Sequence, residues 1–414
     1  MKKYFLEYRR KIFYFLNYLI MLFALVMPIN PYLGKKVFAV IGILWLFSVD
    51  YKKSFKVILD SKILVPIILF SLMYIVSILW SNNVEYGLKW VGVHLTYFLL
   101  PIIVFSTVLT KEFSYRVIAF FIFSMMINEI ISYGIFFGLV DTVLGYKVHG
   151  TASNPVPFQV SHIPYSLYIA FTIFLGLYSI KYQKYLPFKI ITTIFVVTMT
   201  INLFLSSGRT GQFVFVMTSI CFLFIYFIRY KKIFFSMIVV LVSVFVLAYS
   251  YSSTFQQRVI AGKSDIEKVL FDSNYNSSLG VRLGSYKIAP NLLLDNNILV
   301  GIGVGDIGDV VHKRTTLVFG KNSAFEQQKG LLHNTFLEIL LTLGIVGFSI
   351  FIWFLYSLVF SSTFNHYNKY IRYLLLFSIV FSGLSASFYS FKEIMFLFAL
   401  FIPIVATIER EKAG

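Results

Sequence analysis

Residues 331–360 read LLHNTFLEILLTLGIVGFSIFIWFLYSLVF. From Thr335 onward the stretch holds one charged residue, Glu338, and it is long enough to cross a bilayer as a helix. Two polar residues, His333 and Asn334, stand at its entrance, although polar side chains are costly beside lipid. The stretch therefore predicts a membrane-spanning helix, and it raises the question whether His333 serves structure or chemistry.

The rest of the chain has the same apolar character. Of its 414 residues, 58% are hydrophobic and only 13% are charged, whereas soluble domains carry about 25% charged residues. We therefore expect an all-α polytopic membrane protein with about twelve transmembrane helices. Besides the stretch quoted above, the other apolar stretches of helix length lie near residues 12–29, 33–49, 63–80, 91–109, 117–140, 160–180, 188–206, 212–228, 233–251, 371–390 and 394–408.

The distribution of basic residues predicts the orientation. The net charge of +18 could fit a nucleic-acid partner, but 21 of the 36 Lys and Arg residues fall in alternate connections, on the side that holds the termini. The short connections of the opposite side carry six, and one long loop carries the other nine. Short cytoplasmic loops are enriched in Lys and Arg. Both termini are therefore predicted to be cytoplasmic, with membrane lipids and no nucleic acid as partners of the basic residues.

The predicted spans divide the chain into three parts. Residues 1–251 carry helices one to nine, residues 252–332 form a long outer loop, and residues 333–414 carry helices ten to twelve. Loops of such length are uncommon without a function. Within the loop, VRLGSYKIAPNLLLDN at residues 281–296 is amphipathic and is predicted to lie as a helix on the membrane surface.

Two arginines on the outer side are candidates for binding an anion. Arg209 lies in a very short turn, LFLSSGRTGQFVF, where Gly208 and Gly211 leave the backbone bare. Its planar fork suits phosphate oxygens at the membrane boundary, or it extends to lipid headgroups. Arg282 opens the amphipathic stretch, where it is either a second anion ligand or an ordinary solvated arginine.

His333 also has two interpretations. A histidine can accept a proton near neutral pH, or it can stand at the interface and cap the helix together with Asn334. The other five histidines are scattered without metal-ligand spacing, so no metal site is expected. Glu129 is an ionisable group inside a predicted span, which marks an interior contact, but the sequence assigns it no role.

A glycine-rich segment invites a cofactor interpretation. Gly303, Gly305 and Gly308 fit the dinucleotide-binding pattern G-x-G-x-x-G. That fold needs a strand before the glycines and a helix after them, and the following DVVHKRTTLVFG is predicted to be a poor helix. The loop also faces away from the cytosol. We therefore expect a glycine-rich turn packed closely against a helix, and no cofactor.

Three motifs together resemble the O-antigen ligase and polymerase superfamily of bacterial envelope enzymes. They are the Ser-Ser-Gly-Arg turn, the loop arginine followed by LLLDNNILVGIGVGD, and HNTFLEILLTLGIVG. The resemblance covers about residues 200–350 by motif and the whole chain by topology. Within the superfamily, the chain is most similar to the lipopolysaccharide O-antigen ligases.

The resemblance implies an activity and a site. Such a ligase transfers O-antigen glycan from undecaprenyl diphosphate to a sugar hydroxyl of lipid A–core, at the periplasmic face of the inner membrane and without a cofactor. Arg209 and Arg282 would stabilise the diphosphate, with Arg258 as the alternative to Arg282. His333, with a pKa near neutrality, would be the general base. Asn334 and Gln212, which stand in the same motifs, are expected to bind substrate.

Three other functions stay open at this point. An O-antigen polymerase would join repeat units on the same carrier lipid and differs in its acceptor. A peptidoglycan polymerase of the shape, elongation and division type also has many spans and an outer loop, but its catalytic carboxylate signature is not evident here. A lipid-linked glycan flippase would typically show repeated halves and polar groups near the midplane, and the sequence shows no internal repeat.

Overall fold

A computed structural model describes residues 2–410 except 144–145, 149, 158–159, 322, 326–331 and 361–365. The described residues are overwhelmingly helical, and they include one antiparallel pair of two-residue strands, β1 (Thr142–Val143) and β2 (Tyr146–Lys147). Several of the helices are long and apolar. The expected all-α polytopic membrane protein is therefore confirmed.

Helices cover all twelve predicted spans. The N-terminal part comprises α1 (Lys2–Val26), α2 (Pro31–Ser48), α3 (Tyr51–Leu59), α4 (Leu64–Val76), η1 (Ser77–Trp80), α5 (Val84–His94), the π turn η2 (Leu95–Leu99), α6 (Leu100–Val108) and α7 (Lys111–Phe136). The middle part comprises α8 (His162–Tyr182), α9 (Leu186–Leu205), α10 (Arg209–Phe227) and α11 (Lys231–Tyr251). The C-terminal part comprises α15 (Thr335–Phe360), α16 (His366–Ser385), η4 (Phe388–Ser390) and α17 (Lys392–Arg410).

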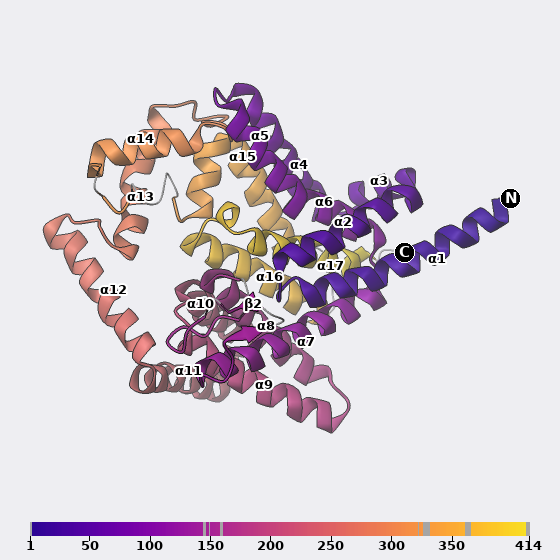
Figure 1. Cartoon of the computed structure of the whole chain (residues 1–414), viewed down its shortest axis with the longest axis horizontal. Helices are drawn as coiled ribbons and strands as arrows, with labels where there is room; N and C mark the ends of the chain where they lie inside the picture. The colour runs from indigo at the N-terminus through magenta and orange to yellow at the C-terminus, as the bar shows by residue number, and fades with distance from the viewer. Residues whose placement is uncertain are drawn as a thin grey trace.

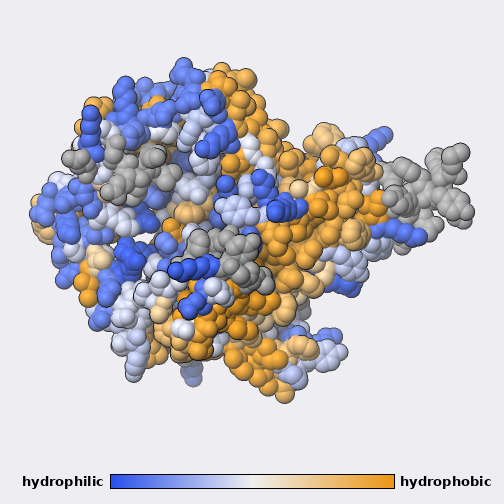
Figure 2. All heavy atoms as spheres, in the orientation of Figure 1, coloured by the Kyte–Doolittle hydropathy of each residue, from blue (hydrophilic) through white to orange (hydrophobic). Residues whose placement is uncertain are grey.

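Eight helices in the described part of the chain are long and apolar enough to cross a membrane. The number rises to nine if α3 and the α4–η1 helix, which meet at a bend of 102°, form one span. The expected number of twelve and the cytoplasmic location of both termini therefore stay predictions. Figure 2 shows hydrophobic residues over much of the helical bundle and hydrophilic residues gathered at one end of the molecule.

The predicted outer loop forms three helices at that hydrophilic end (Figure 1). They are α12 (Ser253–Asp272), α13 (Ser278–Leu294) and α14 (Ile307–Phe319). The predicted helix is confirmed as α13, but its apolar residues are not confined to one face, so the expected amphipathic character is wrong. Ile288 and Leu292 pack on protein, in a small core with Leu332 and Leu341. Contact with α14 and α15 thus replaces the contact with the membrane surface that we expected.

The prediction that residues 309–320 make a poor helix is wrong. They form most of α14. The carboxylate of Asp309 lies in the first turn, where its negative charge interacts favourably with the helix dipole and stabilises the helix. Val311 is fully buried in the small core beside Ile288. The β-branched residues lower intrinsic helix propensity, but burial of an apolar face supplies most of the stability of a short helix in a protein.

The differing burial of two helices separates the core from the periphery. Every residue of α17 from Ile394 to Ile408 is buried, as expected for a helix that is apolar on all sides. α11 is also strongly apolar, yet none of its residues is buried. α17 therefore forms the centre of the bundle, and α11 offers its apolar surface to the membrane.

α15 contains a break at Gly344, and this break explains the glycines there and in the segment around Gly301. Gly344 adopts φ 64° and ψ −167°, which no helix accommodates. The glycine-rich segment inserts there and restores the backbone hydrogen bonds. The N–H groups of Ile302 and Gly303 donate to carbonyl oxygens of α15. In return, the N–H groups of Ile345 and Val346 donate to the carbonyl oxygens of Ile298 and Leu299, at 2.9 and 3.1 Å. Irregular backbone at membrane depth is tolerated where protein satisfies it in this way.

The backbones approach so closely at the break that a side chain has no room. A Cβ on Gly344 would lie 2.3 Å from the carbonyl oxygen of Leu299, and one on Gly301 would lie 2.5 Å from the Gly344 nitrogen. Both glycines also have positive φ, where other residues are strained. The expected glycine-rich turn packed against a helix is thereby confirmed, and the residues before it, 298–300, form a turn and not a strand.

Candidate active site

Arg209 is the first residue of α10, at the turn that follows α9. Gly208 and Gly211 let this turn pack on α8, because a Cβ at either position would lie 2.2 Å from an atom of Ser166. The Gly211 N–H donates to Ser166 Oγ at 3.1 Å. The N-terminus of α10 is thus held against α8, and the partial positive charge of a helix N-terminus adds to that of Arg209.

The guanidinium of Arg209 is only partly buried and faces other charges. It lies within electrostatic range of Arg258 on α12, of Asp265 on α12 and of Arg282 on α13. No hydrogen bond joins it to a side chain or carbonyl in the described parts of the chain. Its five N–H donors are therefore open to an anion.

Arg282 is oriented by two helices. Its Nη1 donates to the carbonyl oxygen and hydroxyl of Ser278 at 2.9 and 3.1 Å, and its Nε donates to the Ser385 carbonyl at the end of α16, at 3.2 Å. Nη2 has no hydrogen-bond partner among the residues that the structure describes. Burial, and then the charge of Arg209, lowers the pKa of Arg282. An anion beside the two arginines would relieve their repulsion.

His333 stands immediately before α15 in an unusual backbone conformation. Its φ of 49° lies in the left-handed region, which non-glycine residues rarely adopt and which is found at functional sites. Burial, and then the charge of Arg282, lowers the pKa of His333 to about 4. The expected pKa near neutrality is therefore wrong, since the imidazole is largely desolvated and faces a cation.

The structure brings Arg209, Arg282 and His333 together as one arginine–histidine site. Arg282 lies at its centre, within electrostatic range of both Arg209 and His333. Arg258, the alternative to Arg282, lies on the other side of Arg209 and interacts with His162 at the start of α8. The geometry thus favours Arg282 over Arg258 as the partner of His333.

Asn334 caps α15, as one interpretation of the sequence suggested. Its Oδ1 accepts the N–H groups of Phe336 and Leu337 at 2.9 and 3.0 Å, and its Nδ2 donates to the Tyr286 hydroxyl of α13. The residue is 3% exposed. Asn334 therefore ties α13 to α15, and its expected contact with substrate stays a prediction.

Gln212 is likewise engaged by protein. It is buried, and its Nε2 donates to the carbonyl oxygens of Leu203 and Ser206 at 3.1 and 3.0 Å. These carbonyls end α9, where backbone acceptors have no partner within the helix. Gln212 thus fixes the turn that carries Arg209, and its expected contact with substrate stays a prediction.

Three supporting residues were missed at the sequence level. Tyr286, which holds Asn334, lies four positions after Arg282 on α13, so helical spacing could have indicated it. Asp265 lies within electrostatic range of Arg209, and it also accepts the Leu279 N–H at 3.3 Å. Ser385 holds Arg282 from α16, 103 residues away, and no local signal indicates it.

Two further expectations concern groups outside this site. Glu129 is buried on α7 and lies within electrostatic range of Tyr133 and Tyr165, and its position assigns it no role in a reaction. In the described ranges, no group of three or more His, Cys, Asp or Glu side chains could hold a metal ion.

Comparison with known proteins identifies the part of the chain that contains the site. Residues 194–352 match the family described as O-antigen ligase. No curated protein matches the chain. The matched segment includes Arg209, Arg282, His333 and both sides of the break at Gly344. The match therefore supports, over this segment, a relationship to the O-antigen ligase and polymerase superfamily.

Proposed function

We propose that the protein is an O-antigen ligase, which transfers glycan from undecaprenyl diphosphate to a sugar hydroxyl of lipid A–core. The family match supports an O-antigen ligase or polymerase of lipopolysaccharide biosynthesis. One observation supports a diphosphate-linked donor: Arg282 lies within electrostatic range of both Arg209 and His333, with Asp265 near Arg209. Such an excess of positive charge next to a proton acceptor suits a diphosphate leaving group and an attacking hydroxyl.

The arginines would act on the donor. As the bond between the anomeric carbon and the diphosphate oxygen breaks, negative charge grows on the diphosphate. Arg209 and Nη2 of Arg282 would neutralise that charge with donors held in place before the reaction. Because Ser278 and Ser385 fix the rest of the Arg282 guanidinium, little reorganisation is needed. No metal is required for this step.

His333 would act on the acceptor. The sugar hydroxyl attacks the anomeric carbon, its oxygen forms the new glycosidic bond, and its proton passes to the imidazole. The low pKa keeps His333 neutral and ready to accept a proton. A bound diphosphate would offset the charge of Arg282 and raise the pKa of His333, so the base would strengthen when the donor is present. Direct attack of this kind inverts the anomeric centre.

The proposed location follows from the charge distribution along the chain. A bacterial inner membrane with the site on its periplasmic face puts α12–α14 outside and the connections rich in Lys and Arg inside. No nucleotide-sugar supply exists there, so a donor already activated on a membrane lipid fits the location. The apolar spans would hold the polyprenyl chain, and the acceptor would enter from the lipid A side.

Reconstitution tests the proposal. The purified protein would be mixed with undecaprenyl-diphosphate-linked glycan and lipid A–core, without ATP or added metal, and the products separated on a gel. A ladder of modified lipid A–core that is lost in His333→Ala is expected. Longer glycan on the carrier lipid would instead identify a polymerase. Movement of the glycan across the bilayer with no covalent product would identify a flippase, and a trapped sugar–enzyme adduct would contradict direct attack.

A further inference from the structure

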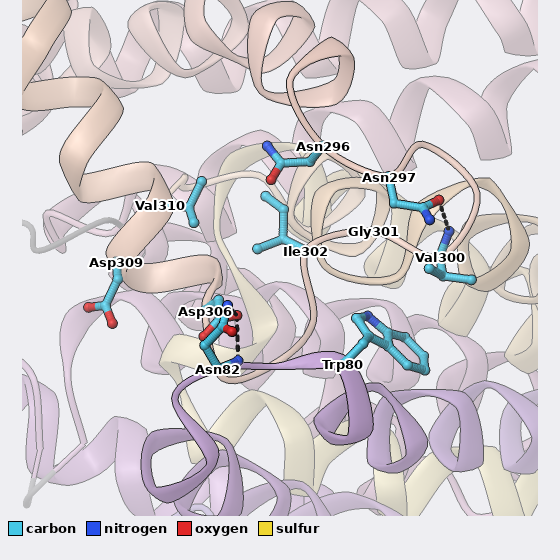
Figure 3. A pocket seen from close by; sticks show the side chains of 10 residues that line it. All are labelled: Trp80, Asn82, Asn296, Asn297, Val300, Gly301, Ile302, Asp306, Asp309 and Val310. Carbon is cyan, nitrogen blue, oxygen red and sulfur yellow. Dashed lines mark hydrogen bonds between the residues drawn. The ribbon is translucent and has the colours of Figure 1, made fainter.

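A pocket of about 480 Å³ opens between the η1–α5 turn and the α13–α14 connection (Figure 3). Its volume lies in the range of small-molecule sites, about 300–1,000 Å³. We call it the Trp80 pocket. Its polar and aromatic lining comes from Trp80, Asn82, Asn296, Asn297, Asp306 and Asp309. No Lys, Arg or His lines it.

The walls of the Trp80 pocket are held in place by hydrogen bonds that leave other atoms open. Both oxygens of Asp306 are used: they accept the N–H groups of Asn82 and Asn83 at 2.7 and 2.8 Å and the Asn82 amide at 3.0 Å. Oδ1 of Asn297 accepts the Leu299 N–H at 3.0 Å. The connection is also bonded into the break of α15. The pocket is therefore preformed.

Four polar atoms of the lining have no partner in the part of the chain that the structure describes. Three are acceptors, namely Oδ1 of Asn82, Oδ1 of Asn296 and Oδ1 of Asp309, and one is a donor, Nδ2 of Asn297. Acceptors suit hydroxyl groups, which can donate, and they repel phosphate oxygens, which can only accept. Trp80 adds an aromatic ring on the opposite side (Figure 3), against which the apolar C–H face of a sugar ring can pack.

We propose that the Trp80 pocket is a subsite for a neutral pyranose of the glycan, separate from the diphosphate site. Ile302 lines the pocket and also belongs to the small core that contains Leu332, the residue before His333. The subsite and the proposed base therefore adjoin the same small apolar core. A sugar at Trp80 would belong to the donor glycan or to the acceptor, away from the reacting anomeric carbon. This inference rests on the proposed transfer of glycan.

Sugar binding can be measured without turnover. The chain has four tryptophans, so Trp45→Phe, Trp90→Phe and Trp353→Phe together leave Trp80 as the only indole emitter. Free glucose, galactose, N-acetylglucosamine and N-acetylgalactosamine would be titrated into this protein. At least one is expected to change the emission saturably, and Asp309→Lys should abolish the change. Glucose 6-phosphate should bind more weakly than glucose, because the pocket carries acceptors and a carboxylate.

Turnover in the otherwise unaltered chain identifies which substrate carries the sugar. Trp80→Ala should raise the KM for one of the two substrates about tenfold, the factor that corresponds to about 1.4 kcal/mol, and leave kcat within about twofold. A change in the KM for the lipid-linked donor assigns the subsite to the donor glycan, and a change in the KM for lipid A–core assigns it to the acceptor. Trp353→Ala, outside the pocket, is the matched control.

The two proposals fail in different ways. If glycan is transferred but no sugar changes the Trp80 emission and neither KM responds to Trp80→Ala, the subsite is overturned and the ligase proposal stands. If sugars bind at Trp80 but no glycan is transferred, the sugar-binding pocket stands and the ligase proposal is overturned. An equal loss of kcat in Trp80→Ala and Trp353→Ala would show a general structural effect and overturn the subsite.

Discussion

The arginine–histidine site and the Trp80 pocket adjoin the same small apolar core, yet they have opposite chemistry. The first presents N–H donors and positive charge around Arg209 and Arg282. The second presents mainly oxygen acceptors and the carboxylate of Asp309. A lipid-linked glycan has the matching halves, a diphosphate that accepts hydrogen bonds and sugars whose hydroxyls donate them. The difference teaches that, under the proposed function, the protein would bind the diphosphate and the sugars of one substrate in two regions of opposite polarity.

The two regions also differ in how the chain builds them. The arginine–histidine site takes one residue from each of three motifs, and each of those residues is conspicuous beside an apolar run. The Trp80 pocket joins two segments more than 200 residues apart, through ordinary asparagines and one indole. The following substitutions test three assignments. The arginine–histidine site should perform the chemistry, the Trp80 pocket should recognise sugar, and the break in α15 should hold the two regions together.

The largest effect is expected at the proposed base. His333→Ala should lower kcat by about 10²–10⁴, the usual contribution of general base catalysis, with a smaller change in the KM for the donor. His312→Ala, a histidine of α14 outside the arginine–histidine site, should keep its activity. Rates in the reconstituted system give the comparison, and equal losses in both variants would rule out a specific role for His333.

The next largest losses of activity are expected at the arginines, and the geometry predicts their order. Arg209→Ala and Arg282→Ala should each lower kcat by about 10²–10³, the typical loss when one preorganised donor is removed from developing charge. Arg258→Ala should lower it less, because Arg258 is exposed and interacts with His162 and not with His333. Transfer rates measured at saturating donor test this order. A loss in Arg258→Ala that exceeds the loss in Arg282→Ala would reverse the assignment.

The break in α15 predicts a structural effect that reaches the site. Gly344→Ala would force a side chain into φ 64°, against the Leu299 carbonyl oxygen. Such strain costs about 1–3 kcal/mol. The temperature at which purified protein leaves its monodisperse state in detergent should fall. Gly42→Ala in α2, where a Cβ meets no atom within 4 Å, is the control and should be neutral, so a matching fall in both would refute the role of the break.

The Trp80 pocket predicts a smaller effect, confined to recognition. Asp309 is exposed and near the rim, so Asp309→Asn should fold normally and raise the KM for the glycan substrate only a few-fold, because a single neutral hydrogen bond contributes about 0.5–1.5 kcal/mol. The KM values for donor and acceptor, measured separately, check this. A fall in kcat with both KM values unchanged would place Asp309 in the chemistry and break the division between the two regions.

The smallest effect is a shift of the pH profile. Burial and Arg282 lower the pKa of His333 from 6.5 to about 4. A general base must be unprotonated, so kcat/KM, which reports the free enzyme, should hold as the pH falls and decline only near about 4. The acid limb of kcat should lie at higher pH, because bound diphosphate offsets Arg282. A decline of kcat/KM centred at 6.5 would contradict the buried, cation-facing imidazole.

Much of the fold follows from local properties of the sequence. Apolar stretches such as 335–360 are long enough to span a bilayer, and a helix is the form that satisfies every backbone group there. The prominent site residues could be found for the same reason, since Arg209 and His333 stand where lipid makes polar groups costly. The sequence could not reveal that Asn334 and Gln212 are engaged by protein, because their partners, Tyr286 and the end of α9, are chosen by packing.

By itself, then, the sequence determined the helical membrane architecture and the likeness of residues 194–352 to the O-antigen ligase family, and it predicted Arg209, Arg282 and His333 as a site. Only the tertiary structure decided that Arg282 rather than Arg258 faces His333, that the pKa of His333 is low, and that α14 is a helix. It alone decided that the segment at Gly301 fills the break at Gly344. The physical reason is range. Hydrophobic length and helix propensity act within one segment, whereas desolvation, charge proximity and shared backbone hydrogen bonds depend on which distant segments meet.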